Sequence, residues 1–115
     1  GKVVVLEFMA TWCITCAQQE PILKELYSKY QSDNVILLSV TIDPAFDTPD
    51  VLRSHIAKKG IPWMVARDTT LMLTDYFQVM ELSTILIIAP DGEVKNVFKG
   101  LTDLDTLSSA VDALL

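Results

Sequence analysis

An apolar run leads directly into a helix-like run at Leu6-Glu7-Phe8-Met9-Ala10-Thr11-Trp12-Cys13-Ile14-Thr15-Cys16. The run Val3–Met9 is continuous and rich in β-branched residues, which predicts a strand buried on both faces. From residue 13 to residue 30, apolar residues recur at helical spacing, at Ala17, Ile22, Leu26 and Tyr30. The sequence therefore predicts a strand, a turn and a helix, with Cys13 at the turn.

Cys13 and Cys16 are the only two cysteines of the chain. A helix N-terminus carries unsatisfied N–H groups and a partial positive charge, and both favour a thiolate over a thiol. We therefore predict that Cys13 is the attacking nucleophile. Cys16 lies one helical turn further on and is less exposed, which suits a resolving thiol. Trp12 would shield this site and offer a flat docking surface.

Other interpretations of the two cysteines are less favoured. They could be structural and buried, although chance would seldom place both at a strand-to-helix turn. They could also form half of a zinc site, but zinc usually takes four ligands, and the other soft ligand, His55, falls on a different predicted helix. We predict that His55 is a solvated helix residue. Asp43, Asp47 and Asp50 could suggest a cation site, but two of them resemble turn and cap residues, so this interpretation is not favoured.

The rest of the chain alternates between strand-like and helix-like segments. Further strands are predicted at 35–42, 63–66, 84–89 and 94–98, and further helices at 49–59, 70–77 and after residue 102. Thr48 and Thr102 are predicted helix caps, and Gly60 ends the second helix. Strands that are joined by helices pair in parallel, whereas the turn at 90–92 joins an antiparallel hairpin. The pattern predicts an α/β fold with helices on both faces of a mixed sheet.

Length and composition indicate one globular domain. The chain has 115 residues, of which 50% are hydrophobic and 21% are charged. Its net charge of -6 argues against nucleic-acid binding, since few groups could neutralise phosphates. No apolar run is long enough to span a membrane. The sequence enters its first strand at once, which suggests a trimmed or processed chain, so we infer nothing firm about compartment from the absence of a signal peptide.

Residues 6–16 resemble the active-site strand and turn of the thioredoxin superfamily, and Pro21 matches the proline that kinks the first helix of thioredoxins. The turn at 89–94 and Gly100 fit the same pattern. The resemblance implies a three-layer α/β/α sandwich formed by a single domain, residues 1–115, with a C-terminal antiparallel hairpin. The middle resembles the helix-containing insertion of TlpA/ResA-like proteins, at about 43–62. Peroxiredoxins and respiratory copper chaperones are also similar there, but they lack the C-x-x-C turn.

The resemblance to the TlpA/ResA-like group implies a protein-disulfide oxidoreductase that reduces disulfides, with no bound cofactor and no metal. Its partners would be a disulfide-containing substrate protein and a membrane electron donor, as in cytochrome c maturation. An extracytoplasmic or membrane-tethered location is favoured, a cytoplasmic one stays open, and we expect a monomer. Substrate binding is expected at Trp12 and at the loop of Leu82, Ser83 and Thr84. Two alternatives are a copper-binding or copper-delivery protein that uses the same dithiol, and a thiol peroxidase.

Glu7 lies within a strand that is predicted to be buried on both faces, where a lone carboxylate is costly unless it is paired or protonated. Thioredoxins have an aspartate at the matching position and disulfide isomerases a glutamate, so the resemblance implies a raised pKa and a role in relaying the proton of Cys16. The alternative is a register that turns Glu7 to solvent. Ser83 stands where the family has a cis-proline, and we expect a trans peptide bond before it.

Overall fold

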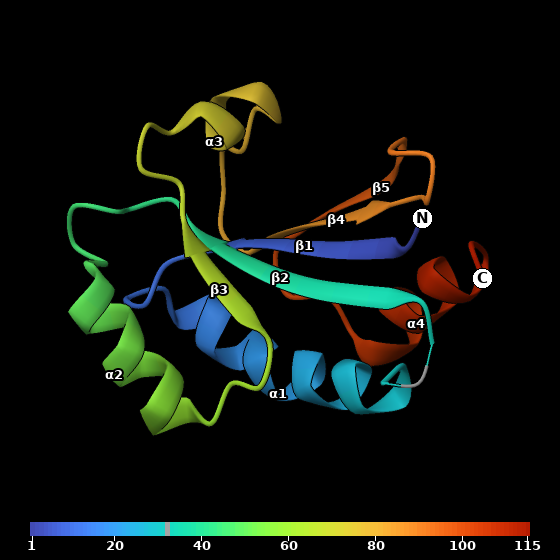
Figure 1. The fold of residues 1–115 in the computed structure, drawn as a ribbon, viewed down its shortest axis with the longest axis horizontal. Coiled ribbons are helices and arrows are strands. Elements are labelled where there is room, and N and C mark those ends of the chain that lie inside the picture. Colours follow the sequence, from blue (N-terminus) through green and yellow to red (C-terminus); the bar gives the residue numbers. More distant parts are fainter. Residues whose placement is uncertain (32) are drawn as a thin grey trace.

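A computed structural model describes residues 1–31 and 33–115. Its strands and helices follow one another in the predicted order (Figure 1). They are β1 (Val3–Met9), α1 (Ile14–Lys29), β2 (Val35–Thr41), α2 (Pro49–Lys59), β3 (Met64–Arg67), α3 (Met72–Tyr76), β4 (Thr84–Ile88), β5 (Val94–Lys99) and α4 (Leu104–Asp112). In the described part of the chain, no helix is long and apolar enough to cross a membrane.

The five strands form one mixed sheet in the order β3-β2-β1-β4-β5. β1 pairs in parallel with β2, and β2 with β3, because a helix follows each of β1 and β2 and returns the chain to the edge of the sheet where that strand began. β4 runs antiparallel to β1, and the tight turn after β4 makes β5 antiparallel as well. The predicted α/β fold with a mixed sheet is therefore confirmed, and β1 is its buried central strand.

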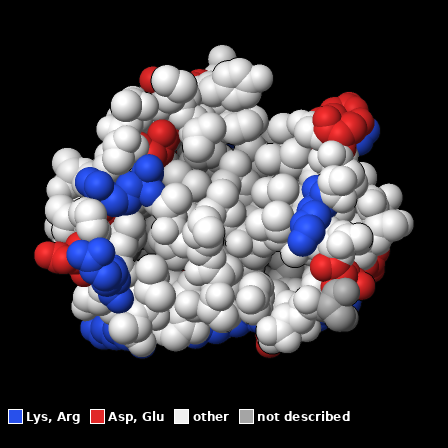
Figure 2. Space-filling model, in the orientation of Figure 1, with Lys and Arg blue, Asp and Glu red and all other residues white. Residues whose placement is uncertain are grey.

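Helices lie on both sides of this sheet, but unequally. Figure 1 shows α1, α2 and α4 on one face and the short α3 on the other. The first face carries a large apolar cluster: Val3, Val5, Leu23, Leu26, Tyr30, Leu37, Ile61, Trp63, Ile85, Ile87, Leu107 and Val111. The second face holds a smaller cluster of Leu6, Phe8, Val40 and Leu86. Few charges lie on the surface between α3 and the β4–β5 hairpin (Figure 2).

The buried face of α1 differs from the predicted one. Ala17 is exposed, whereas Gln19 and Glu20 are buried. The Gln19 side chain bonds both backbone groups of Thr102: its Nε2 donates to the carbonyl oxygen at 2.9 Å, and its Oε1 accepts from the amide at 2.9 Å. The hydrogen bonds of Gln19 offset the cost of burying its amide, which apolar periodicity alone does not foresee.

Two of the predicted helix ends are confirmed and one is wrong. The Thr48 side chain caps α2, and Gly60 ends that helix with a φ of 63°, in the left-handed region that favours glycine. α4 is capped by Asp103 and not by Thr102. The backbone of Thr102 is held against α1 by Gln19, so the helix begins one residue later than expected. The carboxylate of Asp103 then accepts from a first-turn amide at 2.8 Å.

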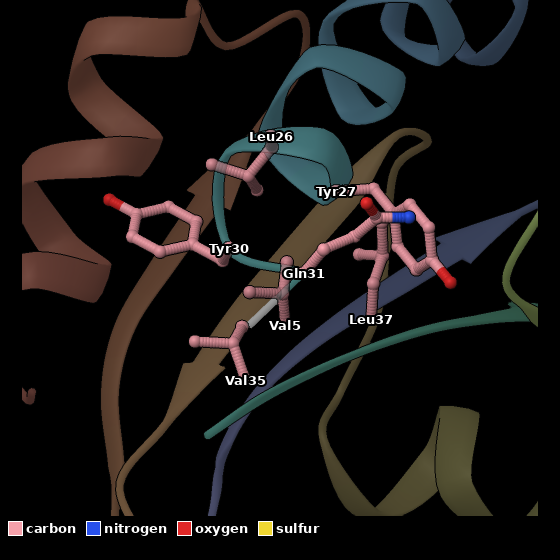
Figure 3. A pocket seen from close by; sticks show the side chains of 7 residues that line it. All are labelled: Val5, Leu26, Tyr27, Tyr30, Gln31, Val35 and Leu37. Atoms are coloured by element: carbon pink, nitrogen blue, oxygen red, sulfur yellow. The ribbon is translucent and has the colours of Figure 1, made fainter. Parts of the chain in front are cut away.

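A pocket lies between the last turn of α1 and the first residues of β1 and β2 (Figure 3). Its lining is mostly apolar: Val5, Leu26, Tyr27, Tyr30, Gln31, Val35 and Leu37. The hydroxyl of Tyr30 donates to Asp112 Oδ1 at 2.6 Å, which ties this end of α1 to α4. Because β1 runs from this pocket toward Cys13, the pocket and the cysteine pair lie at opposite ends of the central strand.

Candidate active site

Cys13 stands where the chain leaves β1 and begins α1, as the sequence predicts. It is the N-cap residue of α1, with extended backbone (φ -81°, ψ 120°). The amide of Cys13 donates to the carbonyl of Ala10 at 3.2 Å, which closes the turn. The amide of Cys16 donates to Cys13 Sγ at 3.2 Å. A first-turn N–H of the helix therefore points at the Cys13 sulfur and stabilises negative charge on it.

Cys16 lies behind Cys13 and is the more protected of the two free thiols. Its exposed fraction is 2%, compared with 9% for Cys13. Burial raises the pKa of Cys16, and the hydrogen bond with Cys13 and the charge of Glu7 act in the same direction. The pair is therefore unequal: the sulfur at the helix N-terminus is the more accessible one, and its neighbour is held as a protonated thiol.

Glu7 is buried in the centre of β1, with 2% of its surface exposed. The alternative register that would turn this residue to solvent is therefore wrong. Burial raises the pKa of Glu7 to about 7. The Ser39 hydroxyl, which donates to Oε1 at 2.6 Å, partly offsets this shift, the charge of Glu20 adds to it, and the Ser83 hydroxyl lowers the pKa slightly. The other oxygen, Oε2, has no hydrogen-bond partner among the described residues. Glu7 is thus an acid that exchanges its proton near neutral pH.

The loop that precedes α2 holds the cysteine turn through two aspartates. The fully buried carboxylate of Asp47 accepts from the amide of Thr11 at 3.1 Å, and also from the Thr11 and Thr41 hydroxyls. Asp43 accepts from Trp12 Nε1 at 2.9 Å. Asp43 and Asp47 therefore do more than shape their own loop, because they fix the two residues that lead into the cysteines.

Replacing Asp47 with alanine should destabilise the reduced protein by about 3 kcal/mol, because one buried donor and two partly buried donors would lose their acceptor. Urea unfolding, followed by tryptophan fluorescence, measures this change. Asp50 is the matched control: it lies three residues away and is 90% exposed, so Asp50→Ala should leave the unfolding midpoint unchanged. Equal effects of the two substitutions would show that the Asp47 contacts are not what holds the turn.

The peptide bond between Leu82 and Ser83 is cis, so the predicted trans bond is wrong. The expectation rested on the local preference of a non-proline residue. The contacts on either side come from elsewhere in the fold: the Ser83 carbonyl accepts from the Gly100 amide at 2.8 Å, and Thr84 enters β4 at once. The Thr84 hydroxyl donates to the carbonyl of Glu81 at 2.6 Å. These two hydrogen bonds hold the end of the loop against the sheet.

A groove runs beside Cys13, between the cysteine turn and the loop that follows α3. It is lined by Trp12, Cys13, Ile14, Thr15, Ile42, Val79, Met80, Glu81 and Leu82. Ile14 is 77% exposed and Met80 is 87% exposed, so the groove has an apolar rim. Trp12 and Leu82, two of the residues at which substrate binding is expected, both line this groove. The side chains of Ser83 and Thr84 are buried and do not line this groove.

His55 is not solvated, contrary to the prediction. Its side chain is 11% exposed, and Nε2 lies 2.8 Å from Glu20 Oε2. α2 packs against α1 here, which places the imidazole on the buried carboxylate. Among residues 1–31 and 33–115, no group of three or more histidine, cysteine, aspartate or glutamate side chains is arranged to hold a metal ion.

Sequence reasoning does not identify Ser39, and it does not identify the contact of Asp47 with the cysteine turn. Ser39 is a polar residue within the apolar run of the second strand, and it pairs with Glu7 across the sheet. A hydroxyl residue in one predicted buried strand and a carboxyl residue in the next could have indicated that the two side chains form a hydrogen bond. Asp47 has no comparable signal, since its partner Thr11 lies 36 residues earlier in the chain.

A protein-family model described as thioredoxin-like matches residues 1–94 of this chain. The thiol-disulfide oxidoreductase ResA of Oceanobacillus iheyensis is 30% identical over 107 residues, which are 93% of this chain and 54% of that protein. ResA of Bacillus subtilis is 28% identical over 100 residues, or 87% of this chain and 54% of that protein. The chain thus spans about half the length of these curated relatives.

Solved structures share the fold across the whole chain. A thiol-disulfide isomerase from Corynebacterium glutamicum superimposes with a TM-score of 0.90 at 22% identity. The match covers 100% of this chain and 81% of the isomerase chain. The likeness confirms the three-layer α/β fold that the sequence motifs imply.

Proposed function

This chain belongs to the thioredoxin-like family, and on that premise we propose that it reduces disulfide bonds in other proteins through Cys13 and Cys16. One observation carries the proposal. The Cys16 amide donates to Cys13 Sγ at 3.2 Å, while the Cys16 thiol itself is buried behind it. The arrangement stabilises negative charge on the accessible sulfur and keeps a second sulfur within one helical turn.

The proposed reaction is two successive thiol–disulfide exchanges. The Cys13 thiolate attacks a substrate disulfide, so a Cys13–substrate bond forms and the substrate bond breaks. The departing substrate thiolate takes a proton from solvent. Cys16 then loses its proton and attacks Cys13 Sγ, which forms the Cys13–Cys16 disulfide and releases the second substrate thiolate. Two electrons pass from the dithiol to the substrate, and an external dithiol restores the starting state.

Glu7 is proposed as the group that accepts the Cys16 proton in the second exchange. Burial raises the pKa of Cys16, so this thiol needs a base before it can attack. The charge of Glu7 contributes to that rise, which means that the two groups are close enough to interact. Because burial also raises the pKa of Glu7 to about 7, its carboxylate takes up and returns a proton near neutral pH.

The groove beside Cys13 is the proposed docking site for the substrate chain. Its apolar rim, with Trp12 and Leu82 on facing sides, suits a disulfide that is flanked by apolar residues. Ser83 and Thr84 would contribute backbone groups and not side chains, since their side chains are buried.

The proposed reaction also bears on the compartment and on the electron donor. Structural disulfides persist in oxidising compartments, so a protein that reduces them is needed outside the cytoplasm. We therefore propose an extracytoplasmic location and a donor in the membrane that supplies electrons. The likeness to the ResA proteins supports these proposals.

The test is reduction of insulin with dithiothreitol as electron donor. Precipitation of the insulin B chain should be faster with the protein than without it, and Cys13→Ala should remove the acceleration. Stoichiometric Cu(I) binding without such turnover would favour the copper-protein alternative. Consumption of peroxide that depends on Cys13, without insulin reduction, would favour a thiol peroxidase.

A further inference from the structure

A chain of three hydrogen-bonding side chains crosses the sheet next to the cysteine pair. Trp63 Nε1 donates to Ser39 Oγ at 2.9 Å, and Ser39 Oγ lies 2.6 Å from Glu7 Oε1. Glu7 and Ser39 are direct partners on β1 and β2, and Trp63 lies immediately before β3. All three residues are buried.

The hydrogen bonds among Trp63, Ser39 and Glu7 run in one direction, from the indole N–H to the carboxyl. An indole N–H donates and cannot accept, so it occupies a lone pair of Ser39 Oγ. The single hydroxyl proton of Ser39 is then free to point at Glu7 Oε1. The ionised carboxylate can only accept, so the Ser39 hydroxyl donates to Oε1. The same direction holds for the neutral carboxyl, because the described residues offer the Ser39 hydroxyl no other acceptor.

The second oxygen of the carboxyl is in a different situation. Glu7 Oε2 and Ser83 Oγ are both buried and form no hydrogen bond of normal geometry among the described residues, although the Ser83 hydroxyl is near enough to lower the pKa of Glu7. A proton on the neutral carboxyl therefore belongs on Oε2. We propose that Trp63 and Ser39 are positioning residues that fix Oε1 as an acceptor and leave Oε2 as the atom that exchanges a proton with Cys16.

This inference rests on the proposed function, because it refines the second exchange. The proton of Cys16 moves to Glu7 Oε2, the Cys16 thiolate bonds to Cys13 Sγ, and the bond between Cys13 and the substrate breaks. Glu7 later returns the proton to solvent. The electron count is that of the dithiol mechanism, so no further reactant is required.

Other titratable groups also face Glu7. Cys16 and Glu20 approach it from α1, and Glu20 is paired with His55 of α2. The substitutions below leave all three unchanged, so differences between variants report on the Trp63–Ser39 contact. A merely structural role for Ser39 would lower stability without moving a titration.

Ser39→Ala should move the titration of Glu7 to higher pH by about one pH unit, because a hydrogen bond to the charged carboxylate is lost. Trp63→Phe keeps an aromatic ring but frees the Ser39 hydroxyl to rotate, so it should shift the titration in the same direction by less. The measurement is a carbon-13 NMR titration of the Glu7 carboxyl in the reduced protein, with the pH dependence of the Cys16 step in single turnover beside it.

Ser108→Ala is the matched control, since Ser108 is also a buried serine but its hydroxyl has no partner among the described residues. Ser108→Ala should change neither the NMR titration of Glu7 nor the pH dependence of the Cys16 step. In a Glu7→Gln background, Ser39→Ala should no longer move the single-turnover profile. An unshifted Glu7 titration in Ser39→Ala, or in Trp63→Phe should the first variant not fold, overturns the inference. If the wild-type protein shows no turnover that depends on Cys13, the proposed function fails instead.

Discussion

Cys16→Ala is expected to halt turnover and to leave the protein covalently joined to its substrate through Cys13. Without the Cys16 thiol, the substrate can be released from Cys13 only by an external thiol. A bimolecular encounter then replaces the intramolecular attack by Cys16. The rate of turnover should fall by roughly a hundredfold or more. Mass spectrometry of the reaction mixture, quenched with acid, should show the mixed disulfide as the main protein species.

Cys13→Ala provides the comparison for this trapping experiment. It removes the sulfur that the Cys16 amide contacts and leaves a thiol that is 2% exposed and has a raised pKa. This variant should form almost no mixed disulfide at neutral pH. Equal trapping by both single variants would mean that the two sulfurs have interchangeable roles, which contradicts the assignment of attacking and resolving thiols.

Glu7→Gln should change the pH dependence of stability as well as of catalysis. The folded pKa of Glu7 is raised from 4.5 to about 7 by burial, so the folded state binds a proton that the unfolded state has released between these values. In the wild-type protein, the contribution of this bound proton to the free energy of unfolding is fully present below pH 4.5 and is lost as the pH rises through 7. Relative to Glu7→Gln, it should lose on the order of 3 kcal/mol of unfolding free energy.

Urea unfolding of both reduced proteins at several values between pH 4.5 and pH 8 measures this difference. A difference in unfolding free energy that is the same at every pH reflects the replacement of the carboxyl by an amide. Only a difference that changes with pH reports on the titration of Glu7. In single turnover, the Cys16 step of Glu7→Gln should be slower at pH 7 and should lose its dependence on a group that titrates there. Parallel stability curves would show that Glu7 keeps an ordinary pKa and would remove its role as a base.

The sequence predicts the fold and the position of the cysteines because local signals agree there. The apolar run Val3–Met9 forms the central strand, and Cys13 is the residue that caps the following helix. The order of all the strands and helices also follows from local patterns, since each apolar run ends at a turn or a cap. Helix-to-strand connections then determine which strands are parallel.

Errors occur where a polar residue meets a partner that is distant in sequence. Gln19 and Glu20 fall outside the predicted apolar positions of α1, yet both are buried, because Thr102 and His55 supply their hydrogen bonds. The solvated His55 and the Thr102 cap were wrong for the same reason. The trans peptide bond expected before Ser83 was wrong as well, since that expectation considered only the local preference of a non-proline residue.

The double contact between Gln19 and Thr102 ties the reactive helix to the far end of the polypeptide. Gln19 lies one helical turn after Cys16. Proteolytic cleavage before Thr102 would leave the side-chain amide of Gln19 buried without these two hydrogen bonds. A fragment that ends there would keep both sulfurs in its sequence but lose the scaffold that orients them. Redox competence is therefore a property of nearly the entire chain, and peptides that carry only the Trp-Cys-Ile-Thr-Cys motif should behave as ordinary thiols.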